Sequence, residues 1–150
     1  MAHTNPPDAE IKQLLISATT IAVVGASSNP MRPSNNIVLR LLQLGYRVIP
    51  VNPNETEVCG EKAYASLSDV PVAIDIVDVF RRAEYTPAIA DEAVKVGAKA
   101  LWLQQGVWSE DAAARATAGG LTVIMDACIA VEHAVLQVPR RPTKSRFPAE

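Results

Sequence analysis

Short, nearly continuous apolar runs alternate with amphipathic stretches along most of this chain. An apolar run without polar alternation, such as IAVV or LTVIM, is typical of a strand buried on both faces of a parallel sheet. The pattern predicts five strands, at 20–24, 47–51, 73–80, 100–104 and 121–125.

Between these runs, apolar residues three and four positions apart predict helices. The segment 55–69 is polar and irregular, and we expect it to hold an extra short edge strand around Ala63 and Tyr64 and a helical turn opened by Ser66 or Ser68. Residues that favour helix ends predict the helix limits. We expect N-terminal caps at Asp8, Ser34, Thr86 and Ser109, ends at Gly45, Gly97 and Gly119–Gly120, and a short closing helix over 130–137.

Strands that alternate with helices indicate an α/β protein in which helices cover both faces of the sheet. We therefore predict a Rossmann-like three-layer sandwich with a mainly parallel five-stranded sheet. Right-handed crossovers would place the first strand at the centre, and ligands would bind beyond the carboxyl ends of the strands. Residues 1–18 are expected to form a helix packed on the domain, 19–137 the domain itself, and 138–150 a flexible, basic, Pro-rich tail.

Composition narrows the functional classes. A chain of 150 residues that is 49% hydrophobic matches one globular domain, and its net charge of −2 provides no field that attracts nucleic acid. No apolar run approaches the roughly 18 residues of a membrane span, and the N-terminus lacks the blocks of a signal peptide, so we expect a cytoplasmic protein. Cys59 and Cys128 lie far apart without ligand-like spacing, which predicts reduced thiols and neither a disulfide nor a metal site.

The stretch TTIAVVGASSNPMRPS, from Thr19 to Ser34, has the order strand, tight turn, helix. In α/β sheets the first such turn is where phosphates meet the N–H groups of a helix N-terminus. The dinucleotide fingerprint G-x-G-x-x-G is absent, and the second strand ends in Asn52–Pro53 instead of the acidic residue that binds the ribose of NAD. No P-loop sequence occurs either. The pattern therefore indicates a phosphate site of another kind.

Five motifs in order along residues 21–136 carry a family resemblance: VVGASSNPMRPS, VIPVNP, IDIVDVFRRAE, LWLQQGV and MDACIAVEH. Together they resemble the small stand-alone CoA-binding proteins, which are similar to the CoA-binding domain of the succinyl-CoA synthetase α-subunit. The resemblance implies that the VGAS turn receives the CoA phosphates, that the VNP turn lies beside adenosine, and that the turn at Phe80 and Arg81 closes over pantetheine. The binding residues that it implies are Gly25, Ala26, Ser27, Asn29, Pro30, Arg32, Ser34, Asn52, Pro53, Phe80, Arg81, Gln105 and Gly106.

The chemistry of CoA agrees with this set, because its pyrophosphate and 3′-phosphate require N–H, hydroxyl and guanidinium donors. Arg32 is the best single candidate, against the alternative of a solvated surface arginine. For Arg81 and Arg82, we expect one to face the ligand and the other to cover the sheet edge. Two carboxylates in an apolar strand, Asp75 and Asp78, each require a partner. We favour structural pairing over the alternative that Asp78 bonds the Gly25 turn or an arginine near the ligand.

Other candidates for chemistry are weaker. Trp102 and Trp108 flank the Gln105–Gly106 turn and are interpreted as packed core or edge residues. The hypothesis that Cys128 forms a mixed disulfide with the CoA thiol is weakened because Ala127 stands where the family often has a basic residue. His3 lies in a terminus that we expect to be mobile, and His133 is interpreted as a packed residue.

Nucleophilic catalysis requires a base within reach of the nucleophile. Because neither histidine is interpreted as such a base, no catalytic residues are predicted. We expect a protein that binds CoA or acyl-CoA as a carrier, sensor or accessory subunit. The alternatives are an NAD(P)-binding oxidoreductase, a minimal CoA-transferring enzyme, or a partner protein with a vestigial site. Whether the protein forms a homo-oligomer or binds another protein stays open.

Overall fold

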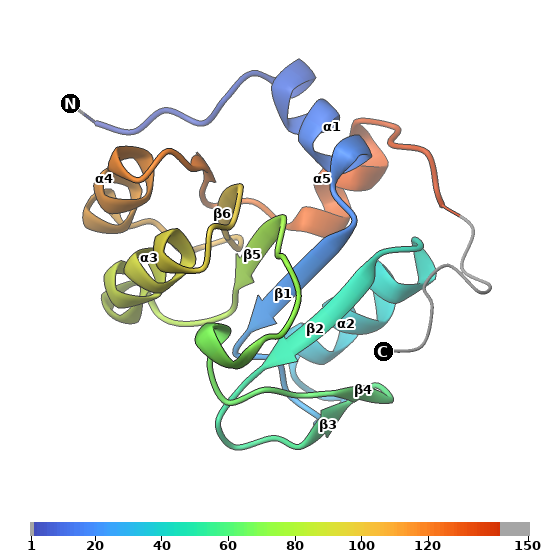
Figure 1. The fold of residues 1–150 in the computed structure, drawn as a ribbon. Coiled ribbons are helices and arrows are strands. Elements are labelled where there is room, and N and C mark those ends of the chain that lie inside the picture. Colours follow the sequence, from blue (N-terminus) through green and yellow to red (C-terminus); the bar gives the residue numbers. More distant parts are fainter. Residues whose placement is uncertain (1, 142–150) are drawn as a thin grey trace.

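A five-stranded parallel sheet lies between two layers of helices in the computed structural model, which describes residues 2–141 (Figure 1). The strands of this sheet are β1 (Thr20–Val24), β2 (Arg47–Val51), β5 (Ile76–Val79), β6 (Ala100–Leu103) and β7 (Thr122–Ile124), and a separate hairpin joins β3 (Glu57–Val58) to β4 (Glu61–Lys62). The helices are α1 (Asp8–Ser17), α2 (Pro33–Gln43), α3 (Thr86–Lys95), α4 (Glu110–Ala118) and α5 (Ile129–Val135), with short 3₁₀ turns η1 (Leu67–Asp69) and η2 (Ala83–Tyr85). The predicted α/β fold with a parallel five-stranded sheet is confirmed.

The strand order is β2-β1-β5-β6-β7, and all neighbours in this sheet are parallel. The prediction that the first strand lies at the centre is wrong, because β5 is the central strand. One strand follows β1 on one side and three are added on the other, which displaces β1 from the middle. The chain nevertheless reverses direction across the sheet at β1, so the carboxyl ends of β1, β2 and β5 define the switch point where ligands bind in such sheets.

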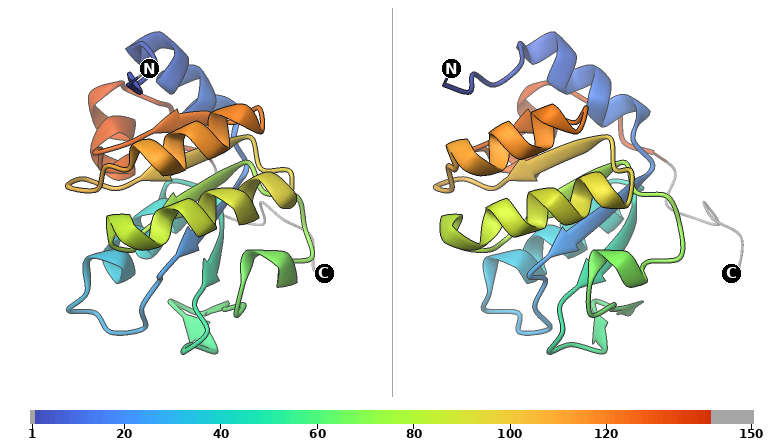
Figure 2. Two further views of the ribbon diagram at one scale, coloured as in Figure 1. Left: turned by 90° about the vertical axis from the view of Figure 1, so that its left-hand side faces the viewer. Right: turned by 60° about the vertical axis from the view of Figure 1, so that its left-hand side comes forward.

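Helices α3 and α4 cover one face of the sheet, and α1, α2 and α5 cover the other (Figure 2). Alternate residues of β1 enter the two cores: Ala22 and Val24 pack with the α3/α4 layer, whereas Ile21 and Val23 pack with the α1/α2/α5 layer. All five residues of β1 are buried. This double burial explains why its sequence lacks polar alternation.

The strand boundaries are narrower than the apolar runs. The run predicted at 73–80 forms a strand only over Ile76–Val79, although the N–H groups of Asp75 and Phe80, one residue beyond each end, also donate to β1 carbonyls. The fourth and fifth strands each end one residue early. The extra edge strand reduces to a single parallel bridge between Val51 and Tyr64, and the β3–β4 hairpin was not predicted.

Helix caps were predicted with mixed success. Ser109 caps α4 by accepting the N–H of Ala112 at 3.1 Å, as expected. Gly45, at φ +97°, follows α2 in the arrangement where the next N–H, of Tyr46, reaches back to Leu41. Asp8 is the first residue of α1 and makes no capping bond, because Pro7 occupies the cap position.

Asp75 is a structural carboxylate, as favoured from the sequence. It accepts the N–H groups of Thr19 and Thr20 at 2.8 and 3.0 Å and pairs with Lys99 at 3.3 Å. These bonds hold the start of β1 against β5. They lower the pKa of the Asp75 carboxyl although its burial opposes them.

The N-terminal segment closes the β7 side of the sheet. The side-chain amide of Asn5 donates to the carbonyl of Met125 at 2.8 Å and accepts its N–H at 2.9 Å, as a neighbouring strand would. His3, expected in a mobile terminus, packs its ring against Trp108, and its backbone N–H donates to the carboxylate of Glu110. Trp102 is fully buried, and its indole donates to Ala127, so its interpretation as a core residue is confirmed.

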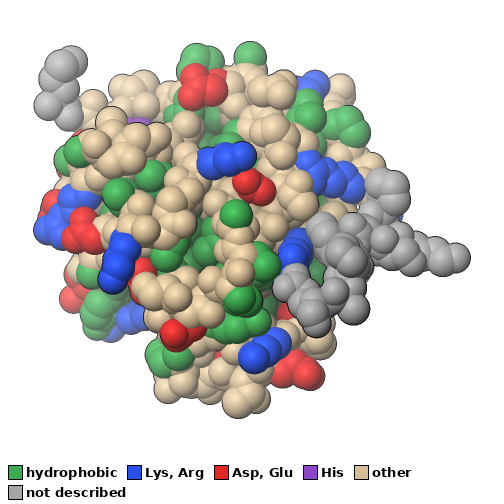
Figure 3. Space-filling view, viewed as in Figure 1, with side chains coloured by type: hydrophobic (Ala, Val, Ile, Leu, Met, Phe, Trp, Pro, Cys, Tyr) green, Lys and Arg blue, Asp and Glu red, His purple; other side chains and the backbone are tan. Residues whose placement is uncertain are grey.

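Beyond α5 the described chain continues to pack on the domain, with Val138 buried. The remainder of the predicted tail, 142–150, lies outside the described residues. Lys and Arg side chains are interspersed with Asp and Glu on the face seen in Figure 3. Within residues 2–141, no helix is long and apolar enough to cross a membrane.

Candidate functional site

The turn at Gly25 brings the ends of three strands together. Its N–H donates to Val51 at the end of β2 at 2.8 Å, and its φ of +86° is a conformation that L side chains rarely adopt. A Cβ at this position would overlap the carbonyl oxygen of Phe80, just beyond β5. Glycine is therefore required here both by backbone conformation and by the close approach of the β5 end.

The loop from Gly25 to α2 is held by its own polar side chains. The N–H of Ser27 donates to Ser34 Oγ at 3.1 Å, and the N–H of Met31 donates to Asn29 Oδ1 at 2.9 Å. Ser34 was predicted as the cap of α2, but it is a buried residue in its first turn, and Arg32 precedes the helix. Its hydroxyl thus fixes the loop in place.

Asn52 joins the β2 turn to this loop. Its side-chain amide donates to the carbonyl of Ala26 at 2.8 Å, while its Oδ1 accepts the N–H of Asn54 at 2.9 Å. The Asn–Pro sequence that ends β2 therefore holds the Gly25 loop from the side, instead of presenting an acid as dinucleotide-binding folds do.

These turns border two adjoining hollows of about 540 and 590 Å³, which we call the crevice. Polar and basic side chains dominate the residues that line both. The shared residues are Gly25, Arg32, Asn52, Asn54, Phe80, Arg81 and Arg82. The first hollow extends over Ser27, Asn29, Pro33, Ser34, Glu55, Gln104 and Val107, and the second over Val24, Val51, Pro53, Ala65, Ser66, Tyr85, Ile89 and Glu92.

Three arginines give the crevice its charge. No hydrogen bond or ion pair of the Arg32 side chain occurs within residues 2–141, and that side chain is exposed. The guanidinium groups of Arg81 and Arg82 lie 4.5 and 5.5 Å from the ring centre of Tyr85, and Arg82 also pairs loosely with Glu84 at 3.8 Å. Guanidinium groups around a hollow are suited to a ligand with several phosphates.

Nine of the thirteen residues predicted for the site line at least one hollow: Gly25, Ser27, Asn29, Arg32, Ser34, Asn52, Pro53, Phe80 and Arg81. Ala26 is buried behind the turn, and Pro30 lines neither hollow. Gln105 and Gly106 are exposed and line neither hollow, and the Gly106 N–H donates to Asp126 Oδ1 at 2.7 Å. The direct roles of all thirteen in binding remain predictions.

Sequence reasoning did not select several lining residues. Arg82 was weighed beside Arg81, and both line the crevice. Gln104 and Val107 flank the turn that was selected instead. Glu55 lies four residues beyond β2, and its only sequence signal was membership of a polar turn.

Asp78 lies in the central strand and is completely buried. Within residues 2–141, neither carboxyl oxygen has a hydrogen-bond partner, so both sequence interpretations, a bond to the Gly25 turn or a nearby arginine and a structural pair, are wrong. Burial raises the pKa of this carboxyl to about 8, which keeps it protonated at neutral pH. Its β-sheet neighbours are Val23 and Trp102.

Other reactive side chains lie away from the crevice. His133 is buried and packs edge-on against Tyr46, which confirms its interpretation as a packed residue; desolvation lowers the pKa of its imidazole. Cys128 is half-buried just before α5 and lines neither hollow. A mixed disulfide at Cys128 stays a prediction. Among residues 2–141, no cluster of three or more His, Cys, Asp or Glu side chains could hold a metal ion.

A parallel sheet with its switch point at β1, a glycine turn leading into α2 and a basic crevice define a Rossmann-like domain. A family model described as "CoA binding domain" matches residues 19–134. The chain belongs to this family, and the family resemblance drawn from the sequence motifs is confirmed.

Relatives extend across bacteria and archaea. The chain is 46% identical over 131 residues to "Uncharacterized protein YneT" of Bacillus subtilis, covering 87% of this chain and 97% of that protein. A solved structure titled "hypothetical protein from Pyrococcus horikoshii OT3" superimposes with a TM-score of 0.85 at 37% identity, covering 91% of this chain and 99% of that one. ADP-forming acetate–CoA ligase II of Archaeoglobus fulgidus is 32% identical over 94 residues, which are 61% of this chain but 14% of the ligase.

Proposed function

We propose that this protein binds CoA or an acyl-CoA in the crevice. The observation that carries the proposal is the convergence of Arg32, Arg81 and Arg82 on two joined hollows, at the carboxyl edge of a domain of the CoA-binding family. A nucleotide with a pyrophosphate and a further phosphate matches the three arginines that line these two hollows.

We further propose a carrier, sensor or accessory role in the cytoplasm, without chemistry of its own. Nucleophilic catalysis requires a nucleophile with a base in contact. Within residues 2–141, neither hollow is lined by cysteine or histidine. The ligases that share this domain are several times longer than the part matched here, which supports the view that a bound CoA is used by other proteins.

Replacing Arg32 by alanine is expected to weaken CoA binding about tenfold, since a hydrogen-bonded charge contact contributes roughly 1.5–3 kcal/mol and exposure reduces that amount. Isothermal titration with CoA, acetyl-CoA, dephospho-CoA, NAD and NADP measures the effect. Arg40→Ala is the matched control, because Arg40 is an exposed arginine of α2 that lines neither hollow.

Selective binding of CoA that Arg32→Ala weakens and Arg40→Ala does not would support the proposal. Binding of NAD alone would overturn it in favour of an oxidoreductase. Failure to bind any of the five nucleotides would leave the vestigial site as the better interpretation.

A further inference from the structure

A carboxylate occupies part of the loop where a phosphate is expected. Glu55 Oε2 accepts the backbone N–H of Ser28 at 2.8 Å, and Glu55 lines the first hollow of the crevice. Ser28 belongs to the Gly25 loop, whereas Glu55 comes from the turn after β2. The contact therefore joins the two segments that border the first hollow, the Gly25 loop and the turn after β2.

The other bonded amides of this loop are held differently. The N–H groups of Ser27, Asn29 and Met31 donate to neutral side-chain oxygens, and those of Gly25 and Arg32 donate to backbone carbonyls. Ser28 is the loop residue whose N–H meets a charged acceptor. An ionised carboxylate and a phosphate oxygen are equivalent acceptors for such an amide.

The turn that carries Glu55 is held firmly. The N–H of Glu55 donates to the carbonyl of Asn52 at 3.2 Å, and the Asn52 side chain is itself bonded to Ala26 in the facing loop. The Ser28 amide lowers the pKa of the Glu55 carboxyl, so this group is ionised at neutral pH. Glu55 is partly exposed and lines the first hollow.

We propose that Glu55 is an internal anion of the crevice that competes with the phosphate of a ligand for the Ser28 amide. The inference rests on the proposed function, and it adds a free-energy cost that a phosphate ligand must overcome before it occupies this site. A ligand that binds the amide must first displace Glu55, and this cost multiplies its affinity by the fraction of protein in which Glu55 has left.

The cost is the same for every phosphate ligand that uses the amide, but its consequence is not. Inorganic phosphate or pyrophosphate has few contacts to offset the cost, so small anions are kept out of the crevice. A nucleotide that also engages Arg32 and Arg81 still binds. A ligand fragment without phosphate, such as pantetheine, has no reason to displace Glu55 and is unaffected.

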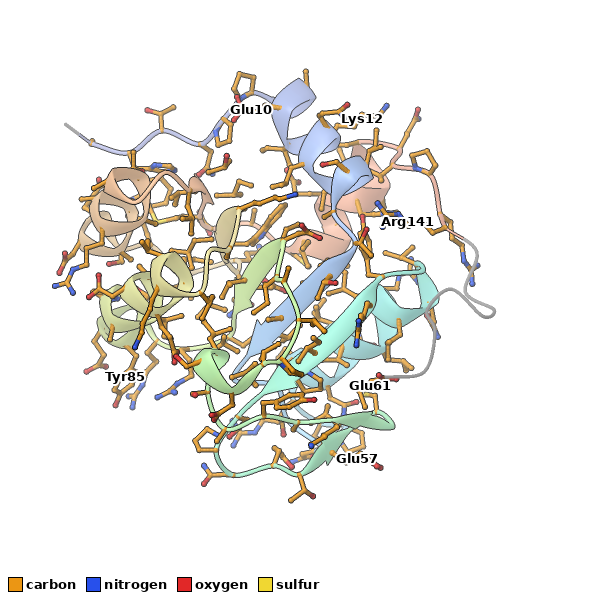
Figure 4. The ribbon with its side chains drawn as sticks, in the orientation of Figure 1. Glu10, Lys12, Glu57, Glu61, Tyr85 and Arg141 are labelled. Carbon is orange, nitrogen blue, oxygen red and sulfur yellow. The ribbon has the colours of Figure 1, made fainter. Side chains whose placement is uncertain are left out.

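Glu55→Ala tests this competition, with Glu57→Ala as the matched control. Glu57, labelled in Figure 4, is an exposed carboxylate on β3 and lines neither hollow. We expect Glu55→Ala to bind pyrophosphate and CoA about tenfold more tightly than the parent, an amount within the range for a hydrogen bond to a charged group, and to bind pantetheine unchanged. Repeating the titration near 1 M salt, where the Debye length is about 3 Å, removes general charge effects and should leave most of the gain.

A second readout does not depend on affinity. In ¹⁵N-labelled protein, the Ser28 amide resonance should shift in ligand-free Glu55→Ala and Glu55→Gln, and should shift in the parent when pyrophosphate is added. If the parent binds CoA but Glu55→Ala shows no gain, or if Glu57→Ala gains equally, the inference fails while the proposed function stands. If neither the parent nor Glu55→Ala binds any polyphosphate, both fail.

Discussion

Gly25→Ala is expected to lower the free energy of unfolding by about 3 kcal/mol or more and to abolish binding in the crevice. A non-glycine residue at φ +86° costs roughly 1–3 kcal/mol. The added Cβ would also overlap the carbonyl of Phe80, and backbone cannot move aside as a flexible side chain can. Relief would require β1 and β5 to separate at their carboxyl ends, where the crevice forms.

Gly106→Ala separates these two costs. Gly106 has nearly the same φ, +87°, but a Cβ there would have nothing within 4 Å. We expect it to lose about 1 kcal/mol from backbone strain alone. Thermal unfolding compares the two variants, since 1 kcal/mol corresponds to roughly 2–4 °C for a domain of this size. Equal losses in both variants would show that the approach of Phe80 to Gly25 is unimportant.

The second large effect is expected at Asp78. Its pKa is about 8 in the folded protein, and a carboxyl of the unfolded chain titrates near ~3.9. Between these values the unfolded chain releases its proton while the folded protein keeps it. The contribution of Asp78 to the free energy of unfolding is therefore fully present below pH ~4. It is lost as the pH rises through the folded pKa, by an amount of order 5 kcal/mol.

Asp78→Asn has the same shape and cannot ionise, so its free energy of unfolding should fall much less between pH 4 and 8. Denaturant titrations at several pH values measure the difference. Asp8→Asn provides the control, because Asp8 is exposed at the start of α1. Parallel pH profiles for the parent and Asp78→Asn would mean that the Asp78 carboxyl is ionised and stabilised in the fold.

The sequence predicted the sheet well because burial on both faces leaves a strong local signal, as in β1. It also located the Gly25 turn, since positive φ and close backbone approach both restrict a position to glycine. Residues of the turns were harder to predict. Ser34 favours a cap or a loop contact equally by type, and which one it makes depends on where Ser27 lies in space.

The sequence also did not predict which residues of the turns after the strands line the crevice. Gly106 lies in a turn after a strand, as Gly25 does, yet it lines neither hollow, and its N–H donates to the carboxylate of Asp126, twenty residues away. Asp78 was expected to have a partner because unpaired buried polar groups are costly. Protonation removes the charge of a buried carboxyl without an ionic partner, and the sequence analysis did not consider a neutral Asp78.

The pairing of Asn5 with Met125 spans most of the chain and so sets an order of events during synthesis. Closing so long a loop is entropically costly until the strands between its ends are already in place. The residues that line the crevice, from Val24 to Val107, all precede Met125 in the chain. During synthesis the binding site can therefore assemble first, while the segment around Asn5 stays unpaired until Met125 has been made.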